Sequence, residues 1–244
     1  MDKAYQKRDY RNWVKSNDLI TFQVTIKETD LLISAEKNLE EESIKSIQYY
    51  RKQLIDYIKR QPEFETSFEP IIIKDDAPLL IKEMGEAGKQ ANTGPFAAVA
   101  GAMAEFIGKD LLEYSDQIIV ENGGDIFISS KTRRVLGIYA GNSPLTGKLG
   151  IRIPAHLSPV GICTSSGTVG HSISFGKADA AIIISKSTSL ADSVATATAN
   201  LIKAKEDIEK AISFAQNIKG IIGVVTIIDE NIAVWGKDIE IVET

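Results

Sequence analysis

Three groups of small polar residues in this chain have the types and spacing that a phosphate or metal site needs. The first is a run of hydroxyl side chains around one glycine, followed by His171, one of only two histidines in the sequence. The run consists of Thr164, Ser165, Ser166, Gly167 and Thr168. Backbone amides exposed in such a loop could bind a phosphate, and a histidine can move a proton near neutral pH. The alternative is that this Ser/Thr-rich loop is only polar surface.

The second group is Asp192 with Thr196, four residues further along the chain. Residues at this spacing share one face of a helix, and a carboxylate and a hydroxyl are oxygen ligands that a hard cation such as Mg²⁺ accepts. Ser189 lies three residues before Asp192, so the pair also matches an approximate capping box, in which Asp192 would bind amides at the start of its own helix. The spacing alone favours the capping interpretation.

The third group surrounds a Gly-Gly pair between two apolar runs. Gly123 and Gly124 predict a hairpin turn, and Glu121, Asn122 and Asp125 place polar side chains at the same strand end. Glycines also let a phosphate or a ribose approach the backbone closely. A plain turn and a ligand-binding turn both fit this pattern.

Composition excludes several classes of function. The chain has 244 residues, 25% of them charged, and a net charge of -5, whereas a nucleic-acid-binding surface usually needs a basic face. The single cysteine, Cys163, excludes an internal disulfide and argues against a cysteine-based zinc site. The sequence contains no G-x-S-x-G elbow, P-loop or G-x-G-x-x-G pattern.

The sequence also predicts a cytoplasmic protein without membrane insertion. The N-terminal residues are charged and lack the apolar segment of a secretory signal. The longest run of small apolar residues, 95–107, contains Glu105 and is too short to cross a bilayer.

Hydrophobic periodicity predicts strands and helices in a mixed order. Strands are expected as hairpins within 19–35 and 117–129, then at 135–140, 148–153, 159–163 and 180–184, and in three short pieces after 220; helices are expected over 39–61, 78–90, 96–114, 189–203 and 206–217. This order predicts one mixed α/β (α+β) domain over 1–244 with layered sheets and flanking helices, and not a doubly wound sheet. A small-residue helix precedes a strand pair around 95–129 and again around 189–235, which suggests an internal structural duplication. The small residues of the first of these helices favour tight packing over a ligand-binding face.

Long motifs spread over nearly the whole chain resemble those of the UPF0280 family. They include GPFAAVAGAMAE, VENGGDI, YAGNSPL, GICTSSGTVGHSISFGKADA and ADSVATATAN. That family is in turn similar to the ApbE-like superfamily, whose best-known members are FAD:protein FMN transferases. The resemblance therefore implies the ApbE-like fold. Those enzymes use Mg²⁺ to cleave the pyrophosphate of FAD, and they attach FMN through a phosphoester to a Thr or Ser of a target protein.

The resemblance implies a role for each of the three polar groups. Asp192 and Thr196 fall on the superfamily's D-x-x-x-T metal ligands, and Val99 begins the stretch that matches its A-K-G-Y-A-V-D helix, where a backbone carbonyl is the third expected ligand. The hairpin residues Asn122, Gly123, Gly124 and Asp125, together with the run 164–168, would bind the ligand. His171 and Asp192 would be the catalytic residues.

The implied cofactors are Mg²⁺ and a flavin nucleotide, FAD or FMN, as the small phosphorylated ligand, and the implied partner is a flavin-acceptor protein. Three features depart from the superfamily pattern: Ala100 replaces the lysine of A-K-G, Glu105 replaces the aspartate of the same helix, and HSISFGKA replaces H-x-x-D-P-x-T-G. Three functions are therefore open. They are a Mg²⁺-dependent flavin transferase or FAD pyrophosphatase, a non-catalytic flavin- or nucleotide-binding module, and an enzyme of the same fold that acts on another small molecule.

Overall fold

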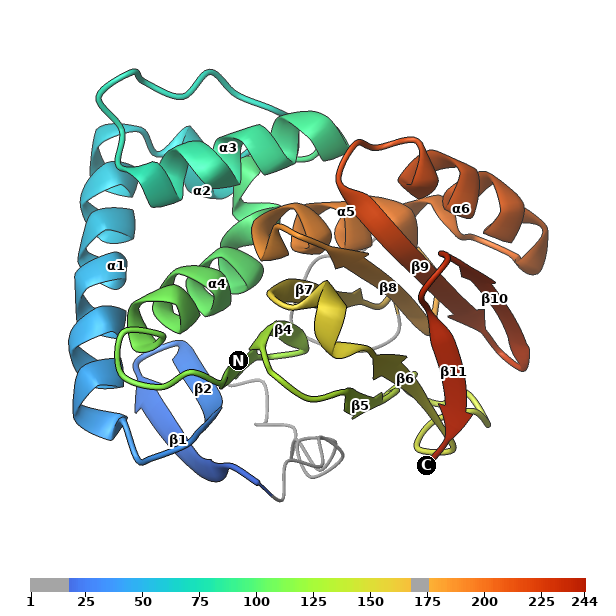
Figure 1. Cartoon of the computed structure of the whole chain (residues 1–244). Coiled ribbons are helices and arrows are strands. Elements are labelled where there is room, and N and C mark those ends of the chain that lie inside the picture. Colours follow the sequence, from blue (N-terminus) through green and yellow to red (C-terminus); the bar gives the residue numbers. More distant parts are fainter. Residues whose placement is uncertain (1–17, 168–175) are drawn as a thin grey trace.

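The computed structural model describes residues 18–167 and 176–244, and within them it contains one large and one small antiparallel sheet (Figure 1). In spatial order the larger sheet consists of β1 (Ile20–Ile26), β2 (Thr29–Ala35), β3 (Ile118–Asn122), β4 (Asp125–Ser129), β7 (Val160–Ser165), β8 (Ala180–Ser185), β9 (Ile221–Ile228) and β10 (Asn231–Trp235). The smaller sheet has the order β11 (Glu240–Glu243), β6 (Leu149–Ile153) and β5 (Arg134–Gly137).

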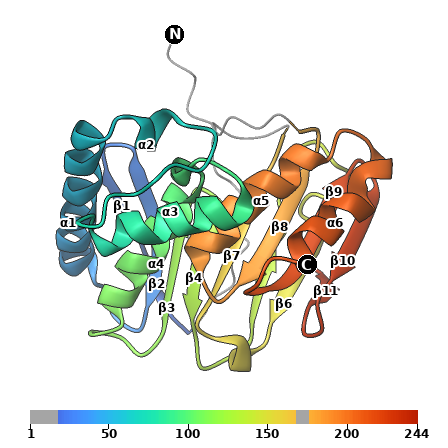
Figure 2. The same ribbon diagram turned by 90° about the horizontal axis from the view of Figure 1, so that it is seen from above.

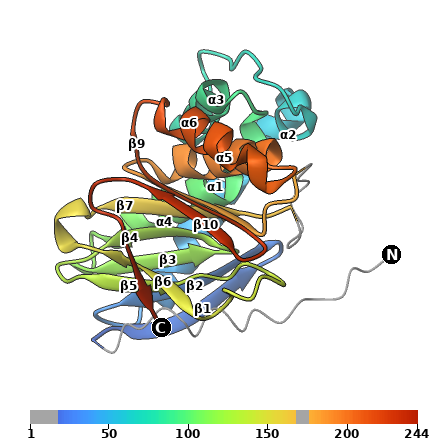
Figure 3. The same ribbon diagram turned by 90° about the vertical axis from the view of Figure 1, so that its right-hand side faces the viewer.

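The helices gather on one side of the larger sheet, and the smaller sheet lies on the other (Figures 2 and 3). The α-helices are α1 (Glu40–Arg60), α2 (Glu63–Thr66), α3 (Leu79–Ala91), α4 (Val99–Leu111), α5 (Thr188–Leu201) and α6 (Ile208–Gln216). Short 3₁₀ helices are η2 (Pro95–Ala98), η3 (Ala155–Leu157) and η4 (Lys205–Asp207).

The period-two alternation of the strands explains these layers. On β3, Ile118 and Val120 join the apolar core beneath α1, α3 and α4, whereas Ile119 joins the core that includes Leu136 and Ile151 of the smaller sheet. Successive side chains of a strand point to opposite faces. Both faces of the central strands are therefore buried, which is why these strands read as nearly continuous apolar runs.

The structure confirms the predicted α+β class and most of the predicted elements. The expected helix over 96–114 begins instead with η2, and its α-helical part, α4, ends at Leu111. The expected strand 159–163 extends to Ser165, and the short helix α2 lies between the helices expected over 39–61 and 78–90, where no element was predicted. None of the helices in 18–167 and 176–244 is both long and apolar enough to cross a membrane.

Tight packing explains the small residues of α4. A Cβ atom added to Gly108 would lie 2.3 Å from Cδ1 of Phe127 on β4, and one added to Gly101 would lie 2.5 Å from the carbonyl oxygen of Thr188 on α5. Contacts below 3.0 Å are essentially never seen for real Cβ atoms. Glycine at these two positions therefore lets α4 approach both the sheet and α5, as the packing interpretation predicts.

Candidate functional site

The start of α4, the β3–β4 hairpin and the first turns of α5 meet around the carboxylate of Asp192. Asp192 is only 9% exposed, and its Oδ2 accepts a hydrogen bond of 2.8 Å from the backbone amide of Gly101. A Cβ atom on Gly101 would lie 2.8 Å from the Asp192 Cβ. The close approach of the two helices thus places a main-chain donor of α4 directly on the carboxylate of α5.

The start of α5 is capped by other residues than the sequence predicted. The N-cap is Ser187, whose Oγ accepts from the amide of Leu190 at 3.2 Å. The capping box of Ser189 and Asp192 is therefore wrong, because the helix begins one residue earlier, at Thr188, and Asp192 is bound by an amide of α4.

Glu105 of α4 supplies the remaining cap. Its Oε2 accepts from the amides of Thr188 at 2.7 Å and Ser189 at 3.2 Å, and its Oε1 lies 2.7 Å from Nζ of Lys109. A carboxylate at a helix N-terminus satisfies unpaired amides and interacts favourably with the helix dipole. Glu105 is 5% exposed, so this cap is a buried polar contact that connects α4 to α5.

The β3–β4 hairpin approaches the same point from the sheet. Gly123 and Gly124 have φ values of 69° and 114°, a region that favours glycine. The side-chain amide of Asn122 donates to the carbonyl oxygen of Ala100 at 3.0 Å, which ties the hairpin to the first turn of α4. The amide of Gly124 donates to Oε1 of Glu121 at 3.1 Å.

Only part of the hydroxyl-rich segment 164–168 is described by the structure and lies beside the β3–β4 hairpin. Thr164 and Ser165 belong to β7, where they pair with Ile182 and Ala181 of β8. The Gly167 amide donates to the carbonyl oxygen of Ala178 at 2.9 Å. The expected loop of exposed amides is therefore wrong for these residues, because their main chain continues the β7–β8 pairing or, at the Thr164 amide, donates to Asp125. Thr168 and His171 lie outside the described residues.

Asp125 and Asp192 form a buried pair of carboxylates. Asp125 is 7% exposed, and its burial, with the charge of Glu121 added, raises its pKa to about 7 against the opposing hydrogen bonds from Cys163 and the Thr164 amide. Burial, and next the charge of Asp125, raise the pKa of Asp192 well above its ordinary value. A like charge nearby disfavours the ionised form of a carboxylate, which is Glu121 for Asp125 and Asp125 for Asp192.

Cys163 lies opposite Asp125 in the β4–β7 register and is buried. Its Sγ donates to the carbonyl oxygen of Thr188 at 3.4 Å. Burial, followed by the charges of Asp125 and Asp192, raises the pKa of this thiol well above its ordinary value. A thiol that stays protonated is a poor nucleophile, so Cys163 acts here as a packing and hydrogen-bonding group.

The donors at this point suit a hard cation. Within 18–167 and 176–244, Oδ1 of Asp125 is buried and has no hydrogen-bond partner. Thr196 is half-buried one turn after Asp192 on α5, and Val99 is the first residue of α4. The same part of the chain contains no group of three or more His, Cys, Asp or Glu side chains that could hold a metal. Mg²⁺ is commonly bound through one or two carboxylates plus the phosphates of a substrate, so this set fits Mg²⁺ and does not fit a zinc centre.

The sequence reasoning missed Glu105 and Cys163 as neighbours of the site. A signal for Glu105 was present, since it is the single charged residue within the apolar run 95–107. No signal in the sequence pairs Cys163 with Asp125, because that contact depends on the order of β4 and β7 in the sheet.

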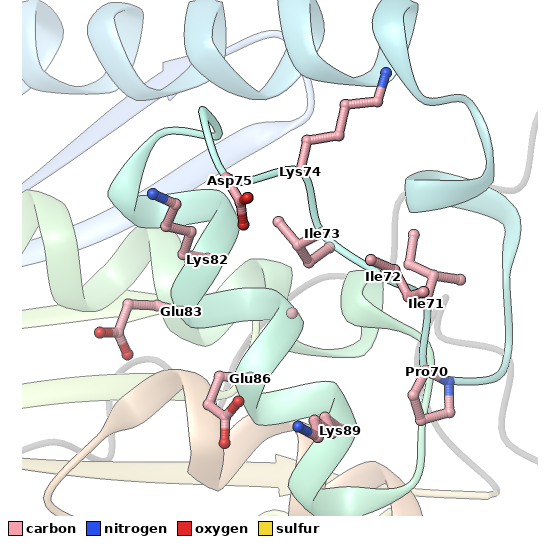
Figure 4. A pocket seen from close by; sticks show the side chains of 11 residues that line it. Pro70, Ile71, Ile72, Ile73, Lys74, Asp75, Lys82, Glu83, Glu86 and Lys89 are labelled. Atoms are coloured by element: carbon pink, nitrogen blue, oxygen red, sulfur yellow. The ribbon is translucent and has the colours of Figure 1, made fainter.

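A separate hollow of about 650 Å³ lies beside α3, between that helix and the segment 70–75 (Figure 4). Ile71 and Ile73 line it together with charges of both signs, among them Lys82, Glu86 and Lys89. None of the residues that the sequence analysis selected lines this hollow.

Comparison with known proteins places the chain among relatives of similar length. A family model described as AbpE bacteria matches residues 11–233. A UPF0280 protein of Methanocaldococcus jannaschii is 40% identical over 232 residues, which cover 91% of this chain and 93% of that protein. A UPF0280 protein of Methanococcus vannielii is 41% identical over 226 residues, 90% of this chain and 92% of that protein.

Two solved structures share the fold at much lower identity. A mutant of the flavin transferase ApbE of Vibrio cholerae has a TM-score of 0.59 and 12% identity, over 89% of this chain and 96% of that one. The apo form of the flavinyl transferase ApbE of Pseudomonas stutzeri has a TM-score of 0.59 and 13% identity, over 91% and 94% of the two chains. At this identity the similarity concerns the fold.

The cap between α4 and α5 leads to a first prediction. Glu105→Ala leaves two buried amides without acceptors and should lower the free energy of unfolding by about 1–3 kcal/mol. Lys109→Ala removes only the half-exposed partner of the same carboxylate and should cost less than about 1 kcal/mol. Urea unfolding followed by circular dichroism measures both, and equal losses would contradict the assigned cap.

The buried carboxylate pair leads to a second prediction. Because the pKa of Asp125 is about 7 in the folded chain and 3.8 is its ordinary value, the folded state binds the proton more tightly. Stability should therefore fall as the pH rises from about 4 to about 7 in the presence of a chelator. Asp125→Asn carries no charge at any of these pH values and should remove the part of this loss that comes from Asp125, while the part that comes from the burial of Asp192 remains.

The measurement is the free energy of unfolding of both proteins at pH 5 and pH 8. Between pH 5 and pH 8, the free energy of unfolding of the original chain should fall by on the order of 2 kcal/mol more than that of Asp125→Asn. An unchanged pH dependence in the variant would show that Asp125 is ionised without penalty.

Proposed function

The chain belongs to the UPF0280 family and has the ApbE fold, and on this basis we propose that it binds Mg²⁺ together with a phosphorylated ligand, a flavin nucleotide. The observation that carries the proposal is the buried pair Asp125 and Asp192, in which Oδ1 of Asp125 has no partner within the described residues. Two buried carboxylates without a cation repel each other, and a bound cation would remove the penalty.

Asp192 and Thr196 would hold the cation, with a main-chain carbonyl at Val99 as a further donor. A bound Mg²⁺ there would neutralise charge that develops on phosphate oxygens. The Gly101 amide holds Oδ2 of Asp192 at 2.8 Å, and the Glu105 cap fixes the helix that carries Asp192 and Thr196. The side chains that receive the cation would thus be ordered before it binds.

The glycine hairpin would receive the ligand. Among the described residues, a Cβ atom on Gly124 would have only the Thr164 carbonyl oxygen within 4 Å, at 3.8 Å, so this part of the chain leaves room for a ligand beside the turn. Asn122 fixes the turn against α4. Thr164 and Ser166 would contribute polar contacts beside it, and Gly123 would let the ligand approach the backbone.

The reaction that fits these groups is cleavage of the FAD pyrophosphate. A hydroxyl oxygen of an acceptor protein, or of water, would form a bond to the phosphorus on the flavin side. The bond from that phosphorus to the bridging oxygen would break, and AMP would leave with the bonding electron pair. The hydroxyl proton would pass to a base, and His171 is the proposed base.

A second candidate is a flavin-binding module without catalysis. Ala100 stands where the transferases have a lysine, and HSISFGKA stands where they have H-x-x-D-P-x-T-G. A chain that lost these groups could keep the carboxylate pair and the glycine hairpin for binding alone.

The test is a reaction of the purified protein with FAD and Mg²⁺, with FMN and AMP separated by chromatography and the melting temperature measured in parallel. We expect Mg²⁺-dependent release of AMP, and Asp192→Asn should lower the rate on the order of 100-fold. The matched control is Asp110→Asn, which changes a carboxylate bound to Ser46 and Tyr50, outside the site.

The outcomes separate the two candidates. Mg²⁺-dependent stabilisation by FAD without products would support the binding module and exclude hydrolysis of the FAD pyrophosphate. If neither FAD nor Mg²⁺ changes the melting temperature and no product forms, both candidates are wrong.

A further inference from the structure

Strand β10 ends the larger sheet within the described part of the chain and leaves one edge without a neighbouring strand (Figure 1). It contains Asn231, Ile232, Ala233, Val234 and Trp235, with no charged residue and no proline. Edge strands of proteins that stay monomeric are usually protected by charges, proline or a bulge. β10 lacks these protections.

The register of the β9–β10 hairpin shows which main-chain groups face outward. Asp229 and Glu230 form a two-residue turn, and Asn231 pairs with Ile228 directly after it. In an antiparallel ladder every second residue exchanges hydrogen bonds with the neighbouring strand. Asn231, Ala233 and Trp235 therefore face β9 with their main-chain groups, and Ile232 and Val234 present theirs to the free edge.

The side chains distinguish this edge from the opposite one. Ile232 and Val234 share one face of β10 and are 36% and 41% exposed. On β1, at the other end of the sheet, the corresponding exposed face carries Thr21, Gln23 and Thr25, which are hydrogen-bonded to Ser34 and Asp30 of β2. The β1 face is polar and already paired, whereas the β10 face is apolar.

The residues that flank β10 carry charges of both signs, and one opposite-charge pair with a second copy follows from them. Asp229 and Glu230 precede the strand, Lys237 and Asp238 follow it, and all four are exposed. If two copies pair antiparallel about Ala233, residues whose numbers sum to 466 lie opposite each other. Asp229 of one copy then lies beside Lys237 of the other, at both ends of the pairing, which favours this register.

We propose that a second copy of this chain pairs with β10 edge to edge, with Ala233 on the twofold axis. Ile232 of each copy exchanges two main-chain hydrogen bonds with Val234 of the other. The exposed Ile232 and Val234 side chains of both copies pack together across the axis, and the two larger sheets become one continuous sheet. This assembly does not depend on the proposed function.

The oligomeric state tests the assembly. Light scattering coupled to gel filtration at a loading concentration of about 100 µM should give the mass of two chains. Val234→Lys places like charges next to each other across the axis and should reduce the mass to that of one chain. Ile20→Lys, at an exposed position of the β1 edge, should leave the dimer intact.

Circular dichroism melting of each variant establishes that the fold is retained, and Ile232→Lys serves as a second variant if Val234→Lys fails to fold. A monomeric original chain, or a dimer that persists in the folded Lys variants, would overturn the proposal.

A disulfide tests the register. Directly opposite residues of a non-hydrogen-bonded pair bring their Cβ atoms to about 4.5–5.5 Å, the shortest cross-strand separation. Ala233→Cys should therefore form a covalent dimer on mild oxidation, whereas Ile20→Cys should not. Disulfide formation by the native cysteine should be slight, because Cys163 is the single cysteine of the original chain and is buried. A dimer that Ala233→Cys fails to crosslink would contradict the pairing about Ala233.

Discussion

The close contact between α4 and α5 at Gly101 is the constraint on which the rest of the site depends. The missing side chain lets the Gly101 amide reach Oδ2 of Asp192, and it lets Glu105 reach the amides that open α5. Both contacts cross more than 80 residues of sequence. They hold a carboxylate that burial alone would disfavour, because an ionised group away from water needs hydrogen bonds or an opposite charge. The hydrogen bond from the Asn122 side chain to the Ala100 carbonyl oxygen holds the β3–β4 hairpin against the start of α4.

The contact between α4, α5 and the β3–β4 hairpin leaves two buried carboxylates, Asp125 and Asp192, whose ionised forms are disfavoured in the folded chain. This penalty is an electrostatic imbalance that a proton or a cation can relieve. Burial raises the pKa of both Asp125 and Asp192, the charge of Glu121 adds to the rise at Asp125 and the charge of Asp125 to the rise at Asp192, and the hydrogen bonds that the two carboxylates receive offset this only in part. Protons can neutralise such a pair at low pH, and a cation can do so at neutral pH. The proposed Mg²⁺ would offset this imbalance.

Most elements of the fold could be predicted from the sequence, because period-two and period-3.6 patterns report which face of a strand or helix is buried. The Gly123-Gly124 hairpin was correctly predicted, since its φ values need glycine. The order of strands in the sheet has no local signal, so Cys163 beside Asp125 could not be predicted. Glu105 had a signal as the single charge in the apolar run 95–107, but nothing in the sequence named its partners on α5. The capping box at Asp192 failed for the same reason: a distant amide competes for the carboxylate. The spacing alone could not decide between a cap and a ligand at Asp192, and the site roles that the resemblance to UPF0280 proteins implies stay predictions.

The most direct test of the central claim is the position of a cation in the folded protein. Crystals grown with FAD and Mn²⁺, a substitute for Mg²⁺ that scatters anomalously, would locate the ion without reference to activity. The account predicts one anomalous peak within coordination distance of the Asp192 carboxylate and the Thr196 hydroxyl, next to the phosphates of the nucleotide. A nucleotide bound elsewhere, or an anomalous peak outside coordination distance of the Asp192 carboxylate, would contradict the proposed site.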